Sequence, residues 1–187
     1  ISYYCRLVMF RNIRTSLGLN RIKKKSSKIT RNRKVQNFET AKSAAILFDA
    51  AEDKSFNHIK GFKKYLDELG INTELTGYVD EDEIPDALLL WENCQVYCKK
   101  DLNLIYQIKD QQIENFLTTE YDILFDLSLE DHIPLIQLSS ISISRFKVGR
   151  YKESFNDYDL MINIEDQNRI EFFIEQIKNY VSILNKD

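Results

Sequence analysis

The stretch AAILFDAAEDKSFNHIKGFKKYLDELGINTELTGYV, residues 44–79, decides the fold. It opens with a short apolar run that ends in Asp49, and it closes with the alternating run 71–79. Between these runs, apolar residues recur at helical spacing over 55–70, and a glycine at the last position is a natural helix stop. The pattern predicts strand, helix, strand, which is the unit from which parallel sheets are built.

The rest of the chain continues this alternation of strands and helices. Further strands are predicted at 94–100, 121–129, 145–151 and 158–164. Helices are predicted in the acidic segment 80–93 and at 110–120, 133–142 and 166–187.

This element order predicts a three-layer α/β/α sandwich with a mostly parallel sheet of about six strands. The last two strands are joined by a loop too short for a crossover helix, so we expect them to pair as a hairpin with one antiparallel edge. We expect Asp166 to cap the final helix.

The net charge of −3 conceals a division between two segments. Residues 1–38 carry eleven Lys and Arg and no Asp or Glu. Residues 39–187 carry the other 15 basic residues and all 29 acidic residues. Such asymmetry indicates a polyanionic or membrane-surface partner for the basic segment.

Residues 1–40 are therefore predicted to be a basic N-terminal extension, helical or extended, and 41–187 to be the α/β domain. Residues 1–20 have apolar residues near helical spacing, which favours a short basic amphipathic helix. Residues 21–38 are polar and basic without periodicity, which is typical of an extended arm or of a helix that forms on a partner.

Contact with structured RNA is the function that this segment most directly predicts, because each cation that neutralises a phosphate releases counterions. The candidate RNA-binding residues are Arg6, Arg11, Arg14, Arg21, Lys23, Lys24, Lys25, Lys28, Arg31, Arg33 and Lys34. Three alternatives stay open: a solvated tail, an anionic membrane surface that buries Leu7, Val8, Phe10 and Ile13, and packing against the acidic body.

A second candidate site is a ligand crevice at the carboxyl ends of the strands. Asp49 and Asp126 end the two most apolar predicted strands, and two acids there could hold Mg²⁺ or act as acid and base. The alternative is that each acid caps the turn that follows it. His132 follows two acids and could be a general base, or it could lie at the surface beside a helix capped by Ser128 or Asp131.

Positive residues on a predicted strand complete this crevice. Lys147 and Arg150, with Arg145, could bind an anion at the sheet edge. The alternative is an edge strand that uses positive charge to discourage pairing with other chains.

Several familiar classes of site are absent from the sequence. It contains no G-x-G-x-x-G, no G-x-x-x-x-G-K-S/T and no G-x-S-x-G, so we expect neither a dinucleotide or P-loop site nor a nucleophile elbow. Cys5, Cys94 and Cys98 lack the spacing of a zinc site or a disulfide framework, which favours reduced cysteines and a cytoplasmic protein without metal or cofactor.

The ordered segments ILFDA, LTGYVD, KKDLN, YDILFDLSLEDHIPL, RFKVGRY, YDLMINI and FFIEQIKNYVSILN carry a resemblance. Over roughly residues 44–184 the chain resembles an uncharacterised family of small bacterial α/β proteins of the Bacteroidetes type, described as a domain of unknown function. The resemblance implies a cytosolic bacterial protein with an α/β sandwich and a basic extension before the first strand. It implies no activity and no catalytic residues.

These observations predict a non-enzymatic accessory protein whose basic arm anchors it to structured RNA, with the ribosome or an assembling ribosomal subunit as the expected particle and ribosomal proteins as further contacts. A rigid acidic domain with a basic arm suits such a particle, since the arm can enter a groove while the body stays outside. The alternatives are a small cytosolic enzyme or ligand-binding domain that uses the crevice near Asp49 and Asp126, and a peripheral membrane protein.

Overall fold

The computed structural model describes residues 3–50, 53–109, 111, 113–153 and 157–184 of the chain. Its sheet has six strands, and all five pairs of neighbours are parallel. The strands are β1 (Ser43–Asp49), β2 (Asn72–Tyr78), β3 (Cys94–Tyr97), β4 (Ile123–Asp126), β5 (Phe146–Arg150) and β6 (Leu160–Ile162). The α-helices are α1 (Tyr3–Ser26), α2 (Asp53–Glu68), α3 (Asp86–Leu89), α4 (Glu114–Thr118), α5 (Ile133–Ile141) and α6 (Ile170–Ile183).

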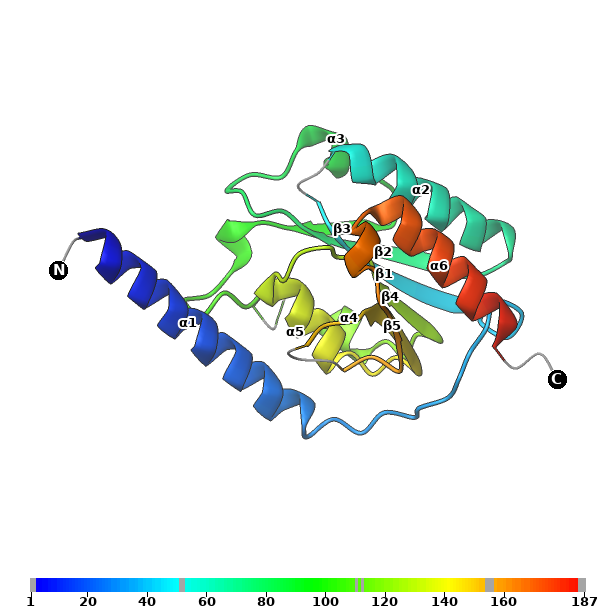
Figure 1. Cartoon of the computed structure of the whole chain (residues 1–187), viewed down its shortest axis with the longest axis horizontal. Helices are drawn as coiled ribbons and strands as arrows, with labels where there is room; N and C mark the ends of the chain where they lie inside the picture. Colours follow the sequence, from blue (N-terminus) through cyan, green and yellow to red (C-terminus); the bar gives the residue numbers. More distant parts are fainter. Residues whose placement is uncertain (1–2, 51–52, 110, 112, 154–156, 185–187) are drawn as a thin grey trace.

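The strand order is β3-β2-β1-β4-β5-β6, so the chain builds outward from β1 in one direction and from β4 in the other. This is the doubly wound arrangement, in which the order reverses between β1 and β4. Figure 1 shows α2 and α6 on one face of the sheet and α4 and α5 on the other. The predicted three-layer α/β/α sandwich is therefore confirmed.

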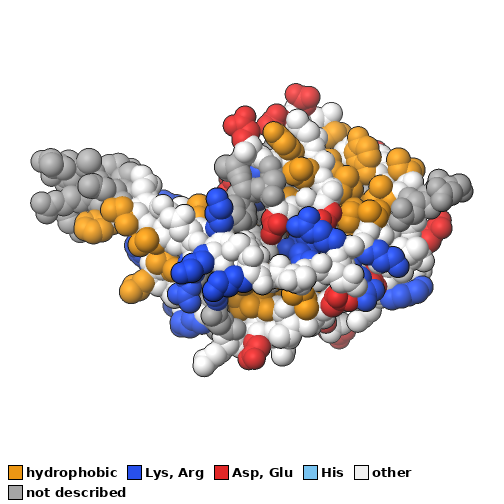
Figure 2. Space-filling view, turned by 90° about the horizontal axis from the view of Figure 1, so that it is seen from below, with side chains coloured by type: hydrophobic (Ala, Val, Ile, Leu, Met, Phe, Trp, Pro, Cys, Tyr) orange, Lys and Arg blue, Asp and Glu red, His pale blue; other side chains and the backbone are white. Residues whose placement is uncertain are grey.

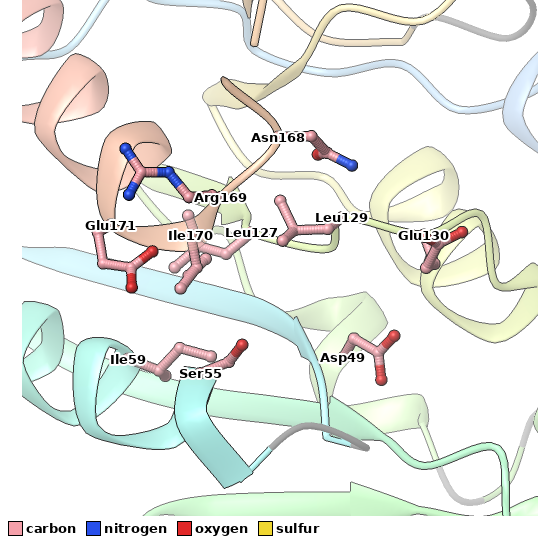
Figure 3. Close-up of a pocket in the computed structure, with 10 residues that line it drawn as sticks. All are labelled: Asp49, Ser55, Ile59, Leu127, Leu129, Glu130, Asn168, Arg169, Ile170 and Glu171. Carbon is pink, nitrogen blue, oxygen red and sulfur yellow. The ribbon is translucent and has the colours of Figure 1, made fainter. Parts of the chain in front are cut away.

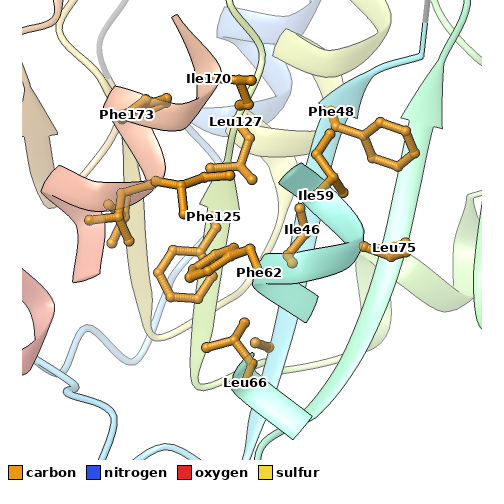
Figure 4. Packing of buried hydrophobic residues seen from close by; sticks show 14 of the residues in the cluster. Ile46, Phe48, Ile59, Phe62, Leu66, Leu75, Phe125, Leu127, Ile170 and Phe173 are labelled. Atoms are coloured by element: carbon orange, nitrogen blue, oxygen red, sulfur yellow. The ribbon is translucent and has the colours of Figure 1, made fainter. Parts of the chain in front are cut away.

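The larger core lies between the sheet and the α2–α6 layer. Figure 4 shows Phe62 of α2 against Phe125 of β4, and the two rings meet edge to face with centroids 5.2 Å apart. Phe173 of α6 is also fully buried in this core. Side chains of alternate residues on β1 point to the two faces, so Ile46 and Phe48 enter this core while Leu47 enters the second core beneath α5.

The helix α1 forms an additional layer outside α5, as Figure 1 shows. Ile22 of α1 is fully buried against Ile133 and Ile136 of α5. The helix continues to Ser26, and the extended segment 27–37 then runs along the body to the first strand. The predicted N-terminal helix is thus longer than the periodicity over 1–20 indicated, because one buried isoleucine continues its packed face into the basic run.

The predicted hairpin of the last two strands is wrong, because β6 pairs with β5 in parallel. The connection between them needs no helix, since its own side chains hold it against the sheet. Tyr158 donates a hydrogen bond to Asp126, and the backbone N–H of Asp159 donates to the Lys147 carbonyl. Gly149 allows this approach, because a Cβ at that position would overlap the Tyr158 ring.

The predicted cap of the last helix is also wrong. Asp166 lies in a separate short 3₁₀ helix, Glu165–Gln167, and α6 begins at Ile170 after Arg169, which makes no side-chain cap. Cys94 and Cys98 are both free thiols. Cys98 is buried, and burial raises the pKa of the half-buried Cys94 to about 12. No helix in the described ranges is long and apolar enough to cross a membrane.

Candidate functional site

The inner face of α1 is fixed to the body by contacts that involve its backbone. Gly18 packs so closely against the loop 102–108 that a Cβ at this position would overlap the carbonyl oxygen of Ile105. The side chain of Gln107, in the same loop, donates a 2.9 Å hydrogen bond to the Gly18 carbonyl. Arg14 donates to the carbonyl of Leu104 and lies over the Tyr106 ring, 4.2 Å from its centroid. These contacts hold α1 in one orientation relative to the sheet.

The extended segment after α1 is fixed by Arg31. Its guanidinium donates to both carboxylate oxygens of Asp159 and to the carbonyls of Ser144 and Arg145. Only 5% of this side chain is exposed. The backbone N–H of Lys34 adds a 3.2 Å hydrogen bond to the Arg145 carbonyl. Arg31 therefore has a structural role that its position in the basic run did not indicate.

The outer face of the same segment carries exposed positive charge. Figure 2 shows Lys and Arg side chains gathered along α1 and at its end. Three lysines occupy the last turn of α1, and further cations follow in the extended segment. The exposed cations on this part of the chain are Arg21, Lys23, Lys24, Lys28, Arg33 and Lys34. Arg11 is also exposed, but it lines a pocket between α1 and the body together with Asp80 and His132.

Most of these exposed cations are free of carboxylates. Within the described part of the chain, Lys23, Lys24, Lys28 and Lys34 form no ion pair, and neither do Arg11 and Arg21. Arg33 is 67% exposed and lies 3.8 Å from Asp159, which Arg31 already neutralises. Lys25 is half-buried and has an interaction of its own, and the Arg6 side chain lies outside the described residues. We call Lys23, Lys24, Lys28 and Lys34 the lysine patch.

The crevice residues do not form one site. Asp126 is 1% exposed and accepts hydrogen bonds from the backbone N–H and hydroxyl of Ser128 and from the Tyr158 hydroxyl. This is the turn-capping role that was the alternative for Asp126, extended by a distant tyrosine. Its carboxylate oxygens thus have protein partners, and it does not pair with Asp49 as two acids of a metal or acid–base site would.

Asp49 instead contacts His132, 83 residues later in the chain, with 2.9 Å between Oδ2 and Nε2. Burial opposes the charged imidazolium, but the hydrogen bond and charge of Asp49 outweigh it, so the pKa of His132 is raised. His132 is the residue before the first turn of α5, and neither Ser128 nor Asp131 caps that helix through its side chain. The surface position expected for His132 is wrong, since its side chain is 21% exposed and bonded to a strand end.

Lys147 and Arg150 do not meet at a sheet edge, because β6 covers β5. The Lys147 side chain is fully buried, and its ammonium donates to the carbonyls of Ser139 and Ser140 near the end of α5. Burial, with the positive charge of nearby Arg31, lowers the pKa of Lys147 to about 8. Arg150 pairs with Asp131. Both residues therefore connect β5 to neighbouring elements rather than facing a common ligand.

A cavity of about 260 Å³ lies beside Asp49, between the first turns of α2 and α6. Figure 3 shows Asp49 and Glu130 on one side of it and Arg169 and Glu171 on the other, with Leu127 between them. The lining mixes both signs of charge with apolar side chains. In the described ranges, no group of three His, Cys, Asp or Glu side chains could hold a metal ion.

A family model matches residues 14–184, which includes the fixed half of α1, the extended segment and the whole sheet. The chain belongs to this family of unknown function, DUF6913. The match begins at Arg14, so the DUF6913 region contains the lysine patch as well as the α/β body. No curated protein and no solved structure matches the chain.

Proposed function

We propose that this DUF6913 protein is a non-enzymatic accessory protein that binds structured RNA through the lysine patch. The ribosome or an assembling ribosomal subunit is the particle we infer, with ribosomal proteins as neighbours of the bound RNA. The observation that carries the proposal is the position of four exposed lysines on a segment that Gly18 and Arg31 hold against the body. None of the four forms an ion pair with a carboxylate in the described part of the chain.

Rigid attachment matters because it reduces the entropy lost on binding. A free basic tail must be ordered when it contacts phosphates, whereas α1 and the extended segment already hold their cations in place. Each lysine that neutralises a phosphate releases condensed counterions, and this favourable contribution is independent of base sequence. The lysine patch therefore suits recognition of a folded RNA by backbone geometry.

A local structural role accounts for only part of this charge. Lysines in the last turn of a helix interact favourably with the helix dipole, by about 0.3–1 kcal/mol each at low salt. That explains Lys23 and Lys24. Lys28 and Lys34 lie beyond the helix, and no carboxylate in the described ranges neutralises them. An external polyanion supplies the missing partner.

The acidic body limits how RNA can approach. Residues 39–187 carry 29 acidic and 15 basic residues, so most of the domain repels phosphate. The exposed cations of 21–34 lie on the face that bears α1 and the extended segment, so we expect RNA to approach from that side. Binding through one face leaves the body projecting from the RNA, as expected of an accessory protein on a large particle.

Matched substitutions test the lysine patch. Lys23, Lys24, Lys28 and Lys34 are changed together to Gln, and the control changes the equally exposed Lys42, Lys60, Lys64 and Lys109 to Gln. Both variants lose four positive charges. In a filter-binding assay with protein-free ribosomal RNA at moderate salt, we expect the patch variant to lose at least about tenfold in affinity, or about 1.4 kcal/mol. Equal losses in the two variants would mean that only net charge matters.

Sedimentation tests the particle. The wild-type protein is expected to pellet with purified ribosomes or subunits and to stay in the supernatant after nuclease treatment or in high salt. At moderate salt, the patch variant is expected to pellet less than the wild type does. A patch variant that pellets like the wild type would exclude the proposed anchoring.

A further inference from the structure

The projecting part of α1 carries an apolar stripe that the fold leaves uncovered. Phe10, Ile13 and Leu17 are 64%, 49% and 53% exposed, and their spacing places them on one side of the helix. Figure 2 shows hydrophobic side chains along this part of the molecule. The exposed cation Arg21 lies four residues after Leu17, at the end of the stripe. A stripe of this composition suits a partner surface that is apolar at its centre and acidic around it.

The same chain presents such a surface on the segment around α3. Leu89 and Leu90 are 63% and 85% exposed, which makes Leu90 the most exposed of the large hydrophobic side chains in the described ranges. The acidic residues around them are also exposed: Glu81, Asp82, Glu83, Asp86 and Glu92. We call Leu89, Leu90 and these acids the α3 patch. Its charge and its apolar centre complement the stripe on α1.

The two surfaces cannot meet within one molecule. α1 is held outside α5, on one face of the sheet, by the contacts of Gly18 and Ile22. The α3 patch is attached to the other face, where Trp91 stacks on Phe48 and meets Phe56 edge to face. The sheet itself separates the two surfaces, so a contact between them must join two copies.

We propose that this protein associates with itself by docking the Phe10–Ile13–Leu17 stripe of one molecule on the α3 patch of a second. The contact joins unlike surfaces, so each molecule offers one of each kind, and association continues into rings or chains. Pairing of two α1 stripes lacks the charge complementarity that the α3 patch supplies, because the stripe ends in Arg21 in both copies. The docking surface is separate from the lysine patch, so the inference does not depend on RNA binding.

Complementary variants test this directly. One variant breaks the stripe with Phe10→Ser, Ile13→Ser and Leu17→Ser, and another breaks the α3 patch with Leu89→Ser and Leu90→Ser. Ile183→Ser is the control, because Ile183 of α6 is also a 62% exposed apolar side chain. All substituted residues are exposed, so circular dichroism is expected to show that each variant folds.

Sedimentation velocity is measured over micromolar to millimolar protein concentrations. We expect the wild type and Ile183→Ser to form oligomers as concentration rises, and each broken variant alone to stay monomeric. An equimolar mixture of the two broken variants retains one intact stripe and one intact α3 patch. It should therefore form dimers and nothing larger.

Several outcomes would overturn the proposal. A wild type that remains monomeric throughout the concentration range is one of them. Oligomers that survive Leu89→Ser and Leu90→Ser would show that the stripe pairs with itself. Stripe-dependent flotation with vesicles of phosphatidylserine and phosphatidylcholine, together with a monomeric wild type, would assign the stripe to a membrane surface. A mixture of broken variants that stays monomeric would also contradict the docking.

Discussion

Arg31 and Arg33 are two residues apart in the basic run, yet the fold uses them in opposite ways. The Arg31 side chain is 5% exposed and bonded to Asp159 and two backbone carbonyls, whereas the Arg33 side chain is 67% exposed. The same contrast separates Arg14, which binds the carbonyl of Leu104, from Arg21. One set of cations fastens the segment to the acidic body, and the other set faces solvent. A count of charges cannot separate these two roles.

Removing a cation that binds the acidic body should produce the largest loss of stability. Arg31→Ala removes the guanidinium that donates to the Asp159 carboxylate and to the carbonyls of Ser144 and Arg145, and we expect a loss of about 2–3 kcal/mol in the free energy of unfolding. Arg33→Ala removes an exposed side chain and should change that free energy by less than about 0.5 kcal/mol. Urea denaturation measures both, and similar losses would remove the distinction between the two sets.

The attachment of α1 should respond to a single methyl group. Gly18→Ala places a Cβ against the Ile105 carbonyl and forces α1 away from the loop, so we expect a loss of about 1–2 kcal/mol in stability and faster proteolysis within α1. Gly61→Ala adds the same group in α2, where nothing lies within 4 Å, and should gain up to about 1 kcal/mol. A gain in both variants would show that α1 is not held by this contact.

A smaller effect is expected at the pair of Asp49 and His132. Because Asp49 raises the pKa of His132 in the folded state, the charged pair stabilises the fold fully below the unfolded histidine pKa of about 6.5. This contribution is lost as the pH rises through the raised folded pKa. Asp49→Asn should lower the pKa of His132 in an NMR titration, while Asp131→Asn, the matched control, should leave it nearly unchanged. A pKa unchanged by Asp49→Asn would contradict the pairing.

The sequence predicts the regular half of the fold well. Residues 44–79 contain their own evidence for a strand, a helix and a strand, because apolar spacing changes from helical to alternating within one short stretch. The direction of β6 was not predictable in this way. Its parallel pairing depends on Tyr158 reaching Asp126 and on Asp159 bonding to Lys147 and Arg31, which are contacts between residues distant along the chain.

The sequence likewise predicts only part of the candidate site. The excess of positive charge over 21–34 is visible in the sequence, and the structure leaves most of these cations exposed. The roles of Gly18 and Arg31 are not, since Gly18 is one small residue in a predicted helix and Arg31 one of eleven basic residues. A single sequence-level signal was present for Gly18, because a glycine inside a helical pattern often marks close packing. The pairing of Asp49 with His132 required the order of the strands.

The salt dependence of RNA binding tests the role of the solvent-facing lysine patch most directly. The slope of log K against log salt counts the phosphates neutralised, at about 0.9 per contact with duplex DNA and about 0.7 with single strands. We predict that changing Lys23, Lys24, Lys28 and Lys34 to Gln reduces the magnitude of this slope by up to about 4, while changing Lys42, Lys60, Lys64 and Lys109 to Gln changes it by less than about 1. Slopes that fall equally in the two variants, or in neither, would contradict the proposal that the lysine patch binds RNA.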